Sequence, residues 1–297
     1  MAIVGSPTSR PGTVNSMTEV RITEYTDPGC PWAFSAEPFR RRIDWLYGEH
    51  VEWVSRMVVL SERPEDYLEK GFTPERQSRA FATIAGDHGM PIDSSERPRM
   101  TATEPACRAV VGARLHAPDL APGLLRCLRV RHFEGHLIDE PAVIGDAAAE
   151  SGLDMAKLEG WMAEPETETR MREDMAKARE PMDAARVLDE KLANWSGGRR
   201  YTCPSYEMTR KSDGVRIAVP GFQPFPVYDV LLANLVPGVP RREPASTVEE
   251  VLEWAGTPLA TREVAVVCDI EPEVAREALG HVADERHVGF DGFWTLR

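Results

Sequence analysis

The sequence lacks long apolar runs and an excess of positive charge. No uninterrupted hydrophobic segment comes near the ~20 residues that a membrane-spanning helix needs. The 297 residues include 35 lysines and arginines against 48 aspartates and glutamates, which gives a formal net charge of −13. This charge repels phosphate backbones and anionic lipid headgroups. We therefore expect no nucleic-acid partner and no membrane partner.

The sequence also lacks the short motifs of common cofactor and metal sites. It contains no Gly-x-Gly-x-x-Gly motif and no P-loop, and Gly197-Gly198 is too short to surround a phosphate. His132 and His136 are four positions apart, but Gly135 lies between them and no paired cysteines are nearby. We predict no metal site and no tightly bound cofactor.

Cysteines are few, odd in number and scattered, which is not the pattern of a secreted disulfide framework. Residues 1–17 are rich in Gly, Pro, Ser and Thr, without the basic start and apolar core of a signal peptide. We expect a disordered tail over residues 1–17 and a cytoplasmic protein. The five cysteines are Cys30, Cys107, Cys127, Cys203 and Cys268.

The most informative stretch begins near residue 20. The segment 20–25 is β-branched and apolar at alternate positions, which predicts a strand. The segment 34–47 has apolar residues near helical spacing and stops at Gly48, which predicts a helix. A second strand is predicted over 51–60. By the handedness rule for strand–helix–strand units, the two strands should pair in parallel.

Cys30 lies at the junction between the first strand and the helix, and Pro31 follows at a position where a missing N–H has no consequence. The unpaired N–H groups of a first helical turn favour an anion, so we expect an accessible Cys30 thiolate with a lowered pKa. Such a thiolate is a nucleophile. The alternative is an ordinary buried cysteine.

The order strand, Asp-Pro-x-Cys-Pro-Trp, long helix and strand resembles the thioredoxin-fold proteins of the DsbA family, and most of all its FrnE-like and 2-hydroxychromene-2-carboxylate isomerase-like branch. The resemblance covers about residues 20–237. It implies an α/β protein in which an all-helical insertion interrupts a thioredoxin fold. There is one departure, because Ala33 stands where the redox members have the second cysteine of Cys-x-x-Cys.

The resemblance also implies domain limits. Residues 18–62 and 195–240 would form the thioredoxin-like domain, and residues 63–194 the helical insertion, which in the family covers the thiol and shapes the substrate pocket. A purely structural bundle is the alternative for the insertion. Residues 237–246 have the composition of a linker.

Residues 245–297 predict three helices followed by a hairpin, which resembles a winged helix, a shape often found bound to DNA. The segment holds eleven acidic residues against four arginines, the wrong sign for binding phosphates. We therefore interpret it as a winged-helix-like packing or dimerisation module, and a homodimer is compatible with this.

In the family, a cis-proline loop follows the insertion and packs beside the nucleophilic cysteine. Pro204 matches that position by its order in the chain, so the resemblance implies that Cys203 lies close to Cys30. Two roles are then open for Cys203. It could resolve a mixed disulfide by pairing with Cys30, or it could serve only as a small apolar side chain.

Two more residues of the motif are candidates for contact with substrate, together with Pro31 and Pro204. Asp27 is three residues before the thiol and could accept its proton, although Asp-Pro-Gly favours a side chain that closes the turn by Asx hydrogen bonds. We expect Trp32 at the rim of the site as a stacking surface, with a core position as the alternative.

Three functional hypotheses follow. The first is a thiol–disulfide oxidoreductase that forms a mixed disulfide on Cys30 with a protein or small-molecule substrate. Cys203 or a low-molecular-weight thiol of the glutathione or mycothiol type would resolve it. The second is a thiol-dependent isomerase or transferase, although those relatives have serine at the position of Cys30. The third is a non-catalytic interaction protein that has lost redox function.

Overall fold

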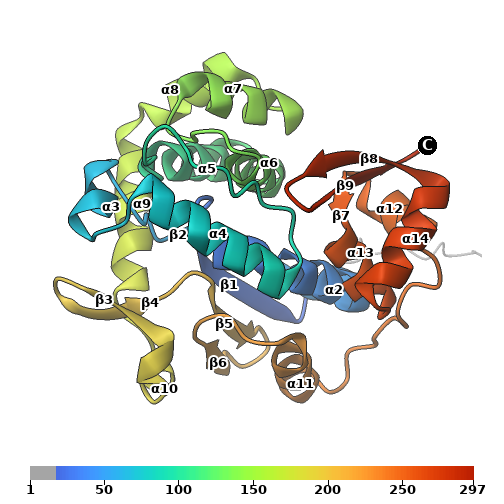
Figure 1. The fold of residues 1–297 in the computed structure, drawn as a ribbon. Coiled ribbons are helices and arrows are strands. Elements are labelled where there is room, and N and C mark those ends of the chain that lie inside the picture. The colour runs from blue at the N-terminus through green and yellow to red at the C-terminus, as the bar shows by residue number, and fades with distance from the viewer. Residues whose placement is uncertain (1–17) are drawn as a thin grey trace, which may run out of the picture.

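A four-stranded mixed sheet forms the centre of the molecule in the computed structural model, which describes residues 18–297 (Figure 1). The predicted disordered tail, residues 1–17, lies outside the described residues. The strand order is β2-β1-β5-β6, with β1 parallel to β2 and antiparallel to β5, and β5 antiparallel to β6. The predicted parallel pairing is confirmed. The strands are β1 Val20–Thr26, β2 Val51–Met57, β5 Ser205–Arg210 and β6 Arg216–Val219.

The helix predicted over 34–47 is two helices, α1 (Pro31–Ser35) and α2 (Glu37–Tyr47). The break has a local cause, because Pro38 has no N–H to donate to the carbonyl of Phe34. The strand predicted over 51–60 ends early, at Met57, since Val59 has a left-handed backbone with φ of 57°.

One face of the sheet carries the main hydrophobic core. Val20 and Ile22 of β1 alternate with exposed positions, and α2 and α11 (Phe225–Leu235) cover them with Ile43 and Leu232. Burying these side chains contributes about 1.5–3 kcal/mol each. This alternation is the period-2 pattern that predicted the strand. The resulting core fixes the end of β1, from which the Cys30 loop begins.

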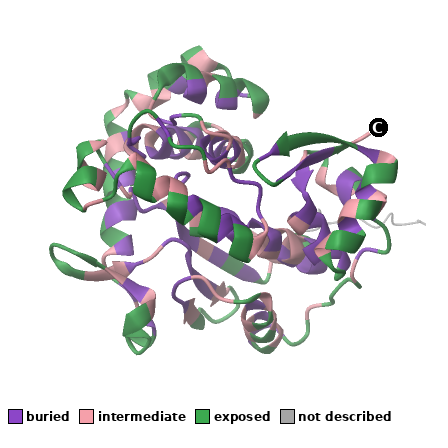
Figure 2. Ribbon diagram, in the orientation of Figure 1, coloured by how far each residue is buried: buried purple, intermediate pink, exposed green. Residues whose placement is uncertain are grey.

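The insertion is helical, as predicted, and lies mainly above the sheet in Figure 1. Its core is built around α5, whose small residues Ala106, Ala109 and Ala113 are buried and permit close helix packing (Figure 2). Thr73 and Asp154 cap two of the helices with side-chain hydrogen bonds. The helices are α3 Glu65–Glu69, α4 Pro74–His88, α5 Glu104–His116, α6 Ala121–Phe133, α7 Pro141–Glu150, α8 Met155–Met162, α9 Pro165–Ala178 and α10 Asp183–Arg186.

A hairpin between the insertion and β5 was not predicted. Its strands β3 (Leu192–Trp195) and β4 (Gly198–Tyr201) form a separate two-stranded sheet. Gly197 lies in the turn of this hairpin, and Gly198 is the first residue of β4. The sequence did not indicate this hairpin because each of its strands has only four residues, too few for a clear alternating pattern. Two short 3-10 helices, Gly48–His50 and Asp189–Lys191, lie just before β2 and β3.

The C-terminal module contains the predicted helices and hairpin, with a short extra strand, and its sheet has the order β7-β9-β8. It is not a tethered domain, because Val251 and Val264 belong to the same core cluster as β1 and α2. The predicted linker follows the surface, and Arg242 N donates to the carbonyl of Leu46. The winged-helix description stays a prediction. The elements are α12 Val248–Ala255, β7 Leu259–Ala260, α13 Thr261–Cys268, α14 Pro272–Val282, β8 Ala283–Val288 and β9 Asp291–Leu296.

Candidate active site

Cys30 occupies the cap position of α1, and Pro31 is the first helical residue. The side chain is only 5% exposed, so the predicted accessibility of the thiol is wrong. The reason is tertiary. Ala178 at the end of α9, Ala185 of α10 and Leu192 of β3 belong to the hydrophobic cluster that encloses Cys30. The end of the insertion and the β3–β4 hairpin therefore cover the sulfur, and a sequence pattern local to Cys30 contains no information about them.

Cys203 and Pro204 lie directly beside Cys30. The Cys203–Pro204 peptide bond is cis. The Cys30 thiol donates a hydrogen bond to the carbonyl oxygen of Cys203, with an Sγ–O distance of 3.3 Å. Cys203 is 7% exposed, and both cysteines are free thiols. Two residues far apart in the chain thus place two reducing groups next to each other.

The two thiols differ in acidity. Burial opposes ionisation of Cys30, but a hydrogen bond with the Cys203 thiol and the backbone N–H groups of Ala33 and Trp32 outweigh burial, so the pKa of Cys30 lies below its ordinary value. Burial raises the pKa of Cys203, and its hydrogen bond to the Cys30 sulfur raises that pKa further. The pair is therefore polarised, since Cys30 is the more acidic of the two thiols and Cys203 the less acidic.

Asp27 is completely buried under the Cys30 loop. Its Oδ1 accepts a hydrogen bond of 2.7 Å from Gly29 N, which is the Asx geometry expected for this turn. Its Oδ2 accepts from Leu60 N at 2.8 Å and from the hydroxyl of Thr103 at 2.7 Å. Burial raises the pKa of Asp27 despite these donors. The carboxylate joins β1, the end of β2 and the start of α5, and it can hold a proton close to the thiols.

Two further side chains lie in the cluster around Asp27 and Cys30, and the sequence analysis did not predict them: Cys107 and Tyr67. The Cys107 thiol of α5 donates to Asp27 Oδ2 over 3.5 Å, and burial and that carboxylate raise the pKa of Cys107. Burial also raises the pKa of Tyr67, and the charges of Asp27 and Cys30 raise it further. Tyr67 of α3 and Cys107 come from the insertion and from different helices. No motif in the sequence around Cys107 distinguished it from an ordinary buried cysteine.

Trp32 lies at the rim, as predicted, with 41% of its surface exposed. Its ring packs edge-on against His88 at the end of α4, with ring centroids 5.0 Å apart, and against Phe222 at 5.7 Å. His88 and Phe222 also contact each other, at 4.7 Å. The three rings form an aromatic patch beside the thiol loop, a surface suited to apolar or aromatic groups.

Glu207 of β5 anchors both sides of the site. It accepts hydrogen bonds from the hydroxyls of Tyr25 at 3.2 Å and Tyr201 at 2.9 Å. The two tyrosine rings lie 4.5 Å apart between centroids. Tyr25 is two residues before Asp27, and Tyr201 is two residues before Cys203. The carboxylate therefore fixes the β1 loop and the cis-proline loop relative to each other.

A buried ion cluster anchors the helix that follows Cys30. Arg129 of α6 is 1% exposed and binds Glu24 of β1, at 2.9 Å, and Glu37 at the start of α2. It also donates to the hydroxyl of Thr26. Burial opposes ionisation of Glu37, but Arg129 and the nearby arginines lower its pKa to about 2. The insertion is thus tied to the strand and helix on both sides of the Cys30 loop.

Among residues 18–297, no group of three or more His, Cys, Asp or Glu side chains is placed to hold a metal ion. Over the same residues, no helix has both the length and the apolar character needed to cross a bilayer.

No family model matches the sequence. The chain is similar to the ClpXP adapter protein SpxH from Halalkalibacterium halodurans, with 25% identity over 270 residues, which cover 88% of this chain and 81% of the relative. The structure is similar to that of a putative protein disulfide isomerase from Nitrosomonas europaea, with 16% identity, a TM-score of 0.55, and coverage of 74% of this chain and 98% of the other.

It is also similar to the cytosolic disulfide reductase DsbM from Pseudomonas aeruginosa, with 19% identity, a TM-score of 0.51, and coverage of 72% of this chain and 98% of the other. DsbM has also been solved with GSH. At these identities the structural likeness shows the fold. The chain therefore has the thioredoxin fold of DsbA-like oxidoreductases, interrupted by a helical insertion.

Proposed function

We propose that the protein is a thiol–disulfide oxidoreductase that reacts through Cys30. The observation that carries the proposal is the polarised pair, in which Cys30 has a lowered pKa and Cys203 a raised one beside a cis-proline loop. A thiolate with a hydrogen-bonded neighbouring thiol is the arrangement that disulfide exchange uses. The fold shared with the disulfide reductase DsbM supports the same reaction class.

The proposed reaction has two steps. The Cys30 thiolate attacks one sulfur of a substrate disulfide, the S–S bond breaks, and the departing thiolate takes up a proton. Because Ala33 cannot supply a second thiol, the mixed disulfide on Cys30 is resolved by one of two routes. In the first, the Cys203 thiolate attacks the Cys30 sulfur, forms a Cys30–Cys203 disulfide and releases the bound group as a thiolate. In the second, a low-molecular-weight thiolate attacks the sulfur of the bound group, which leaves as a disulfide with that thiol while Cys30 is released as a thiolate.

Burial restricts the substrate. With Cys30 only 5% exposed, a large folded protein cannot reach the sulfur unless the covering segments of α9, α10 and β3 move. A small disulfide or a flexible segment needs less displacement. We therefore propose a low-molecular-weight thiol of the glutathione or mycothiol type as the co-substrate in the cytoplasm. The DsbM structure with GSH supports this substrate class.

Mass spectrometry of the intact protein tests the proposal. After incubation with glutathione disulfide, we expect either one glutathione adduct on Cys30 or a loss of two hydrogens that maps to a Cys30–Cys203 crosslink. The Cys30→Ser variant should show neither product. Cys127, which is partly exposed but has a pKa raised to about 11 by burial, provides an internal control. Modification of Cys127 in preference to Cys30 would contradict the proposal.

An interaction function is the second candidate. A ClpXP adapter is similar to this chain over 88% of its length, and Ala33 replaces the second motif cysteine. Both observations fit a thioredoxin fold used to bind a partner. The two candidates are separated by measuring the binding of purified protein to ClpXP with wild type and Cys30→Ser. Binding that is equal in both variants, together with an unreactive Cys30, would favour the adapter.

A further inference from the structure

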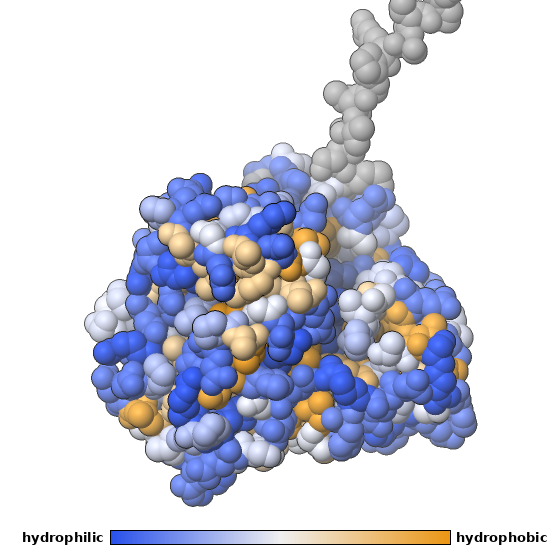
Figure 3. Space-filling model, turned by 90° about the horizontal axis from the view of Figure 1, so that it is seen from above, coloured by the Kyte–Doolittle hydropathy of each residue, from blue (hydrophilic) through white to orange (hydrophobic). Residues whose placement is uncertain are grey.

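A cleft that is lined by neither Cys30 nor Cys203 lies where the thioredoxin-like domain, the helical insertion and the C-terminal module meet. It has a volume of about 550 Å³ and is enclosed by α2, α6, the end of α7, the loop after α12 and the β8–β9 hairpin. Seen from above, the surface is hollowed between the helical insertion and the C-terminal module (Figure 3). Cys30 is not among the lining residues, so the cleft is separate from the site described above.

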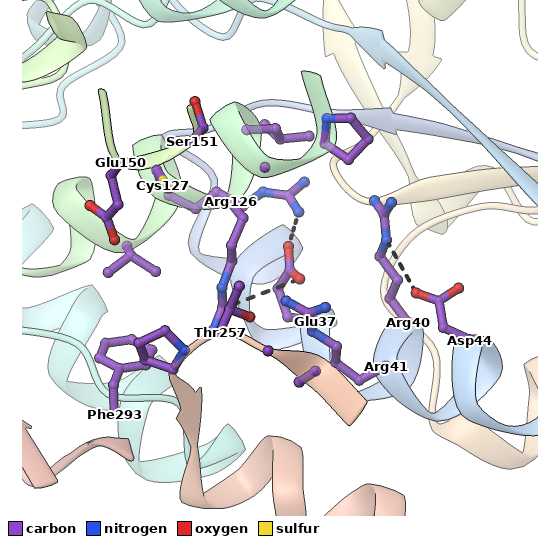
Figure 4. Close-up of a pocket in the computed structure, with 18 of the residues that line it drawn as sticks. Glu37, Arg40, Arg41, Asp44, Arg126, Cys127, Glu150, Ser151, Thr257 and Phe293 are labelled. Atoms are coloured by element: carbon purple, nitrogen blue, oxygen red, sulfur yellow. Dashed lines mark hydrogen bonds and ion pairs between the residues drawn. The ribbon is translucent and has the colours of Figure 1, made fainter. Parts of the chain in front are cut away.

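The lining of this cleft is rich in arginine, although the chain as a whole has a net charge of −13. Three acids also line it, Glu37, Asp44 and Glu150. Figure 4 shows Arg41 from α2 and Arg126 from α6 converging beside Glu37. The lining arginines are Arg40, Arg41, Arg126, Arg129 and Arg286.

Some of these arginines have close acidic partners. Arg129 is paired with Glu24 and Glu37, and Arg40 pairs with Glu24 at 3.2 Å. Glu150 forms an ion pair with Arg131 at 2.9 Å. These ion pairs neutralise the charges of Arg40, Arg129 and Glu150 on the inner wall of the cleft.

The remaining arginines are incompletely satisfied. The Nε of Arg41 is buried without a hydrogen-bond partner among residues 18–297, and its ion pair with Glu263 is 3.6 Å long. Arg126 binds Glu263 at 2.6 Å through one nitrogen, while its other terminal nitrogen is buried, lies 3.8 Å from a Glu37 oxygen and has no hydrogen bond in the described part of the chain. Unpaired buried donors are unfavourable, and a bound acceptor would remove that penalty.

Arg286 completes the positive wall from the other side. It extends from β8, pairs with Glu134 and is half exposed at the cleft. Burial lowers the pKa of Arg286, and the charges of Arg131 and Arg126 lower it further. Mutual repulsion of arginines around a cavity is relieved by an anion between them.

We propose that this cleft binds a small organic anion whose phosphate or carboxylate group is held by Arg41, Arg126 and Arg286. The planar guanidinium groups suit such oxyanions because each can donate two parallel N–H bonds. The hydroxyls of Thr257 and Ser151 also line the cleft and can bind a polar part of the ligand. The volume lies within the roughly 300–1,000 Å³ range of small-molecule sites.

Isothermal titration calorimetry and thermal unfolding of the full chain test this proposal. Inorganic phosphate and citrate are the two probes, with sodium chloride at matched ionic strength as the reference. We expect saturable binding and a rise in Tm for at least one probe, since the ligand would bridge α2 and the C-terminal module. A response to phosphate alone identifies a phosphate ligand, and a response to citrate alone a carboxylate ligand.

Variants locate the binding. Arg41→Ala and Arg286→Ala should each weaken binding roughly tenfold or more, because each removes charge-assisted hydrogen bonds. Arg41→Lys keeps the positive charge but loses the two parallel N–H donors of the guanidinium, so its affinity for the probe should lie between those of Arg41→Ala and wild type. Arg79→Ala on α4, where Arg79 is exposed and pairs with Glu75, is the matched control. Equal responses in all variants, or a chloride effect as large as the probes', would overturn the proposal.

Discussion

The sulfur of Cys30 lies 3.3 Å from the carbonyl oxygen of Cys203, although 173 positions separate the two residues in the chain. This contact brings a second thiol, that of Cys203, beside the cysteine at the helix start. It occurs because β5 pairs with β1 in the same sheet, with Ser205 opposite Tyr25. The loops that precede and follow these strands therefore meet at one edge.

The Cys203 side chain can be tested for two roles with a matched pair of variants. Cys203→Ala removes the donor to the Cys30 thiolate and should raise the pKa of Cys30, so alkylation of Cys30 at neutral pH should slow. Cys203→Ser keeps a hydroxyl donor and should leave the pKa of Cys30 lowered. The pH dependence of the alkylation rate, followed by mass spectrometry, measures both. Equal pH profiles for Ala and Ser would show that this hydrogen bond has no role.

The same pair of variants tests the resolving step. If Cys203 resolves the mixed disulfide, both variants should accumulate the adduct of Cys30 with glutathione, whereas wild type should go on to form the Cys30–Cys203 disulfide. If an external thiol resolves it, all three proteins should release the adduct at similar rates when free glutathione is added. Quenched time points analysed as intact masses distinguish these outcomes.

The Asp27 carboxylate depends on its donors. Thr103→Val removes the 2.7 Å hydrogen bond to Oδ2 and should destabilise the fold by about 1–3 kcal/mol, because a buried acceptor loses a partner. It should also raise the pKa of Asp27 further. Urea unfolding measures the loss. Thr169→Val is the control, since its exposed hydroxyl bonds only a carbonyl within α9, and a loss as large in this control would contradict the assignment.

The Arg129 cluster should be essential for stability. Arg129→Met leaves the buried Glu24 and Glu37 carboxylates without their main counter-charge and should cost roughly 3–5 kcal/mol. Arg21→Met, which removes an exposed ion pair with Glu52, should change stability by less than about 1 kcal/mol. Chemical denaturation of both variants gives the comparison. Similar losses of unfolding free energy in the two variants would show that the buried cluster stabilises the fold no more than an exposed ion pair does.

His132 should make the fold sensitive to mild acid. Burial, with a smaller contribution from Arg97, lowers its pKa to about 3, whereas the unfolded chain has the ordinary value of about 6.5. The unfolded state therefore binds the proton first. This contribution to stability is complete above pH 6.5 and is lost as the pH falls toward 3, by about 1.4 kcal/mol per pH unit.

The His132→Gln variant isolates this effect. Its stability should fall less steeply than that of wild type between pH 6.5 and 5, as measured by urea unfolding at several pH values. His287→Gln is the control, because His287 is mainly exposed on β8. A slope in His132→Gln identical to that of wild type would mean that His132 is not the titrating group.

Much of the scaffold could be predicted because its signals are local. Alternation over residues 20–25 predicted β1, and helical spacing over residues 34–47 predicted the helical segment after Cys30. The break at Ala36 could also have been found from Pro38. The β3–β4 hairpin was missed because its strands are as short as the turns around them.

The sequence by itself determined the order of the elements and the place of Cys30 at a helix start, since periodicity and helix-start chemistry act over a few residues. Only the tertiary structure decided that the Cys30 sulfur is covered, that Cys107 rather than another cysteine meets Asp27, and that arginines of α2, α6 and β8 line one cleft. These contacts join segments tens to more than two hundred residues apart. Their existence depends on how whole helices and strands pack, which no local pattern records.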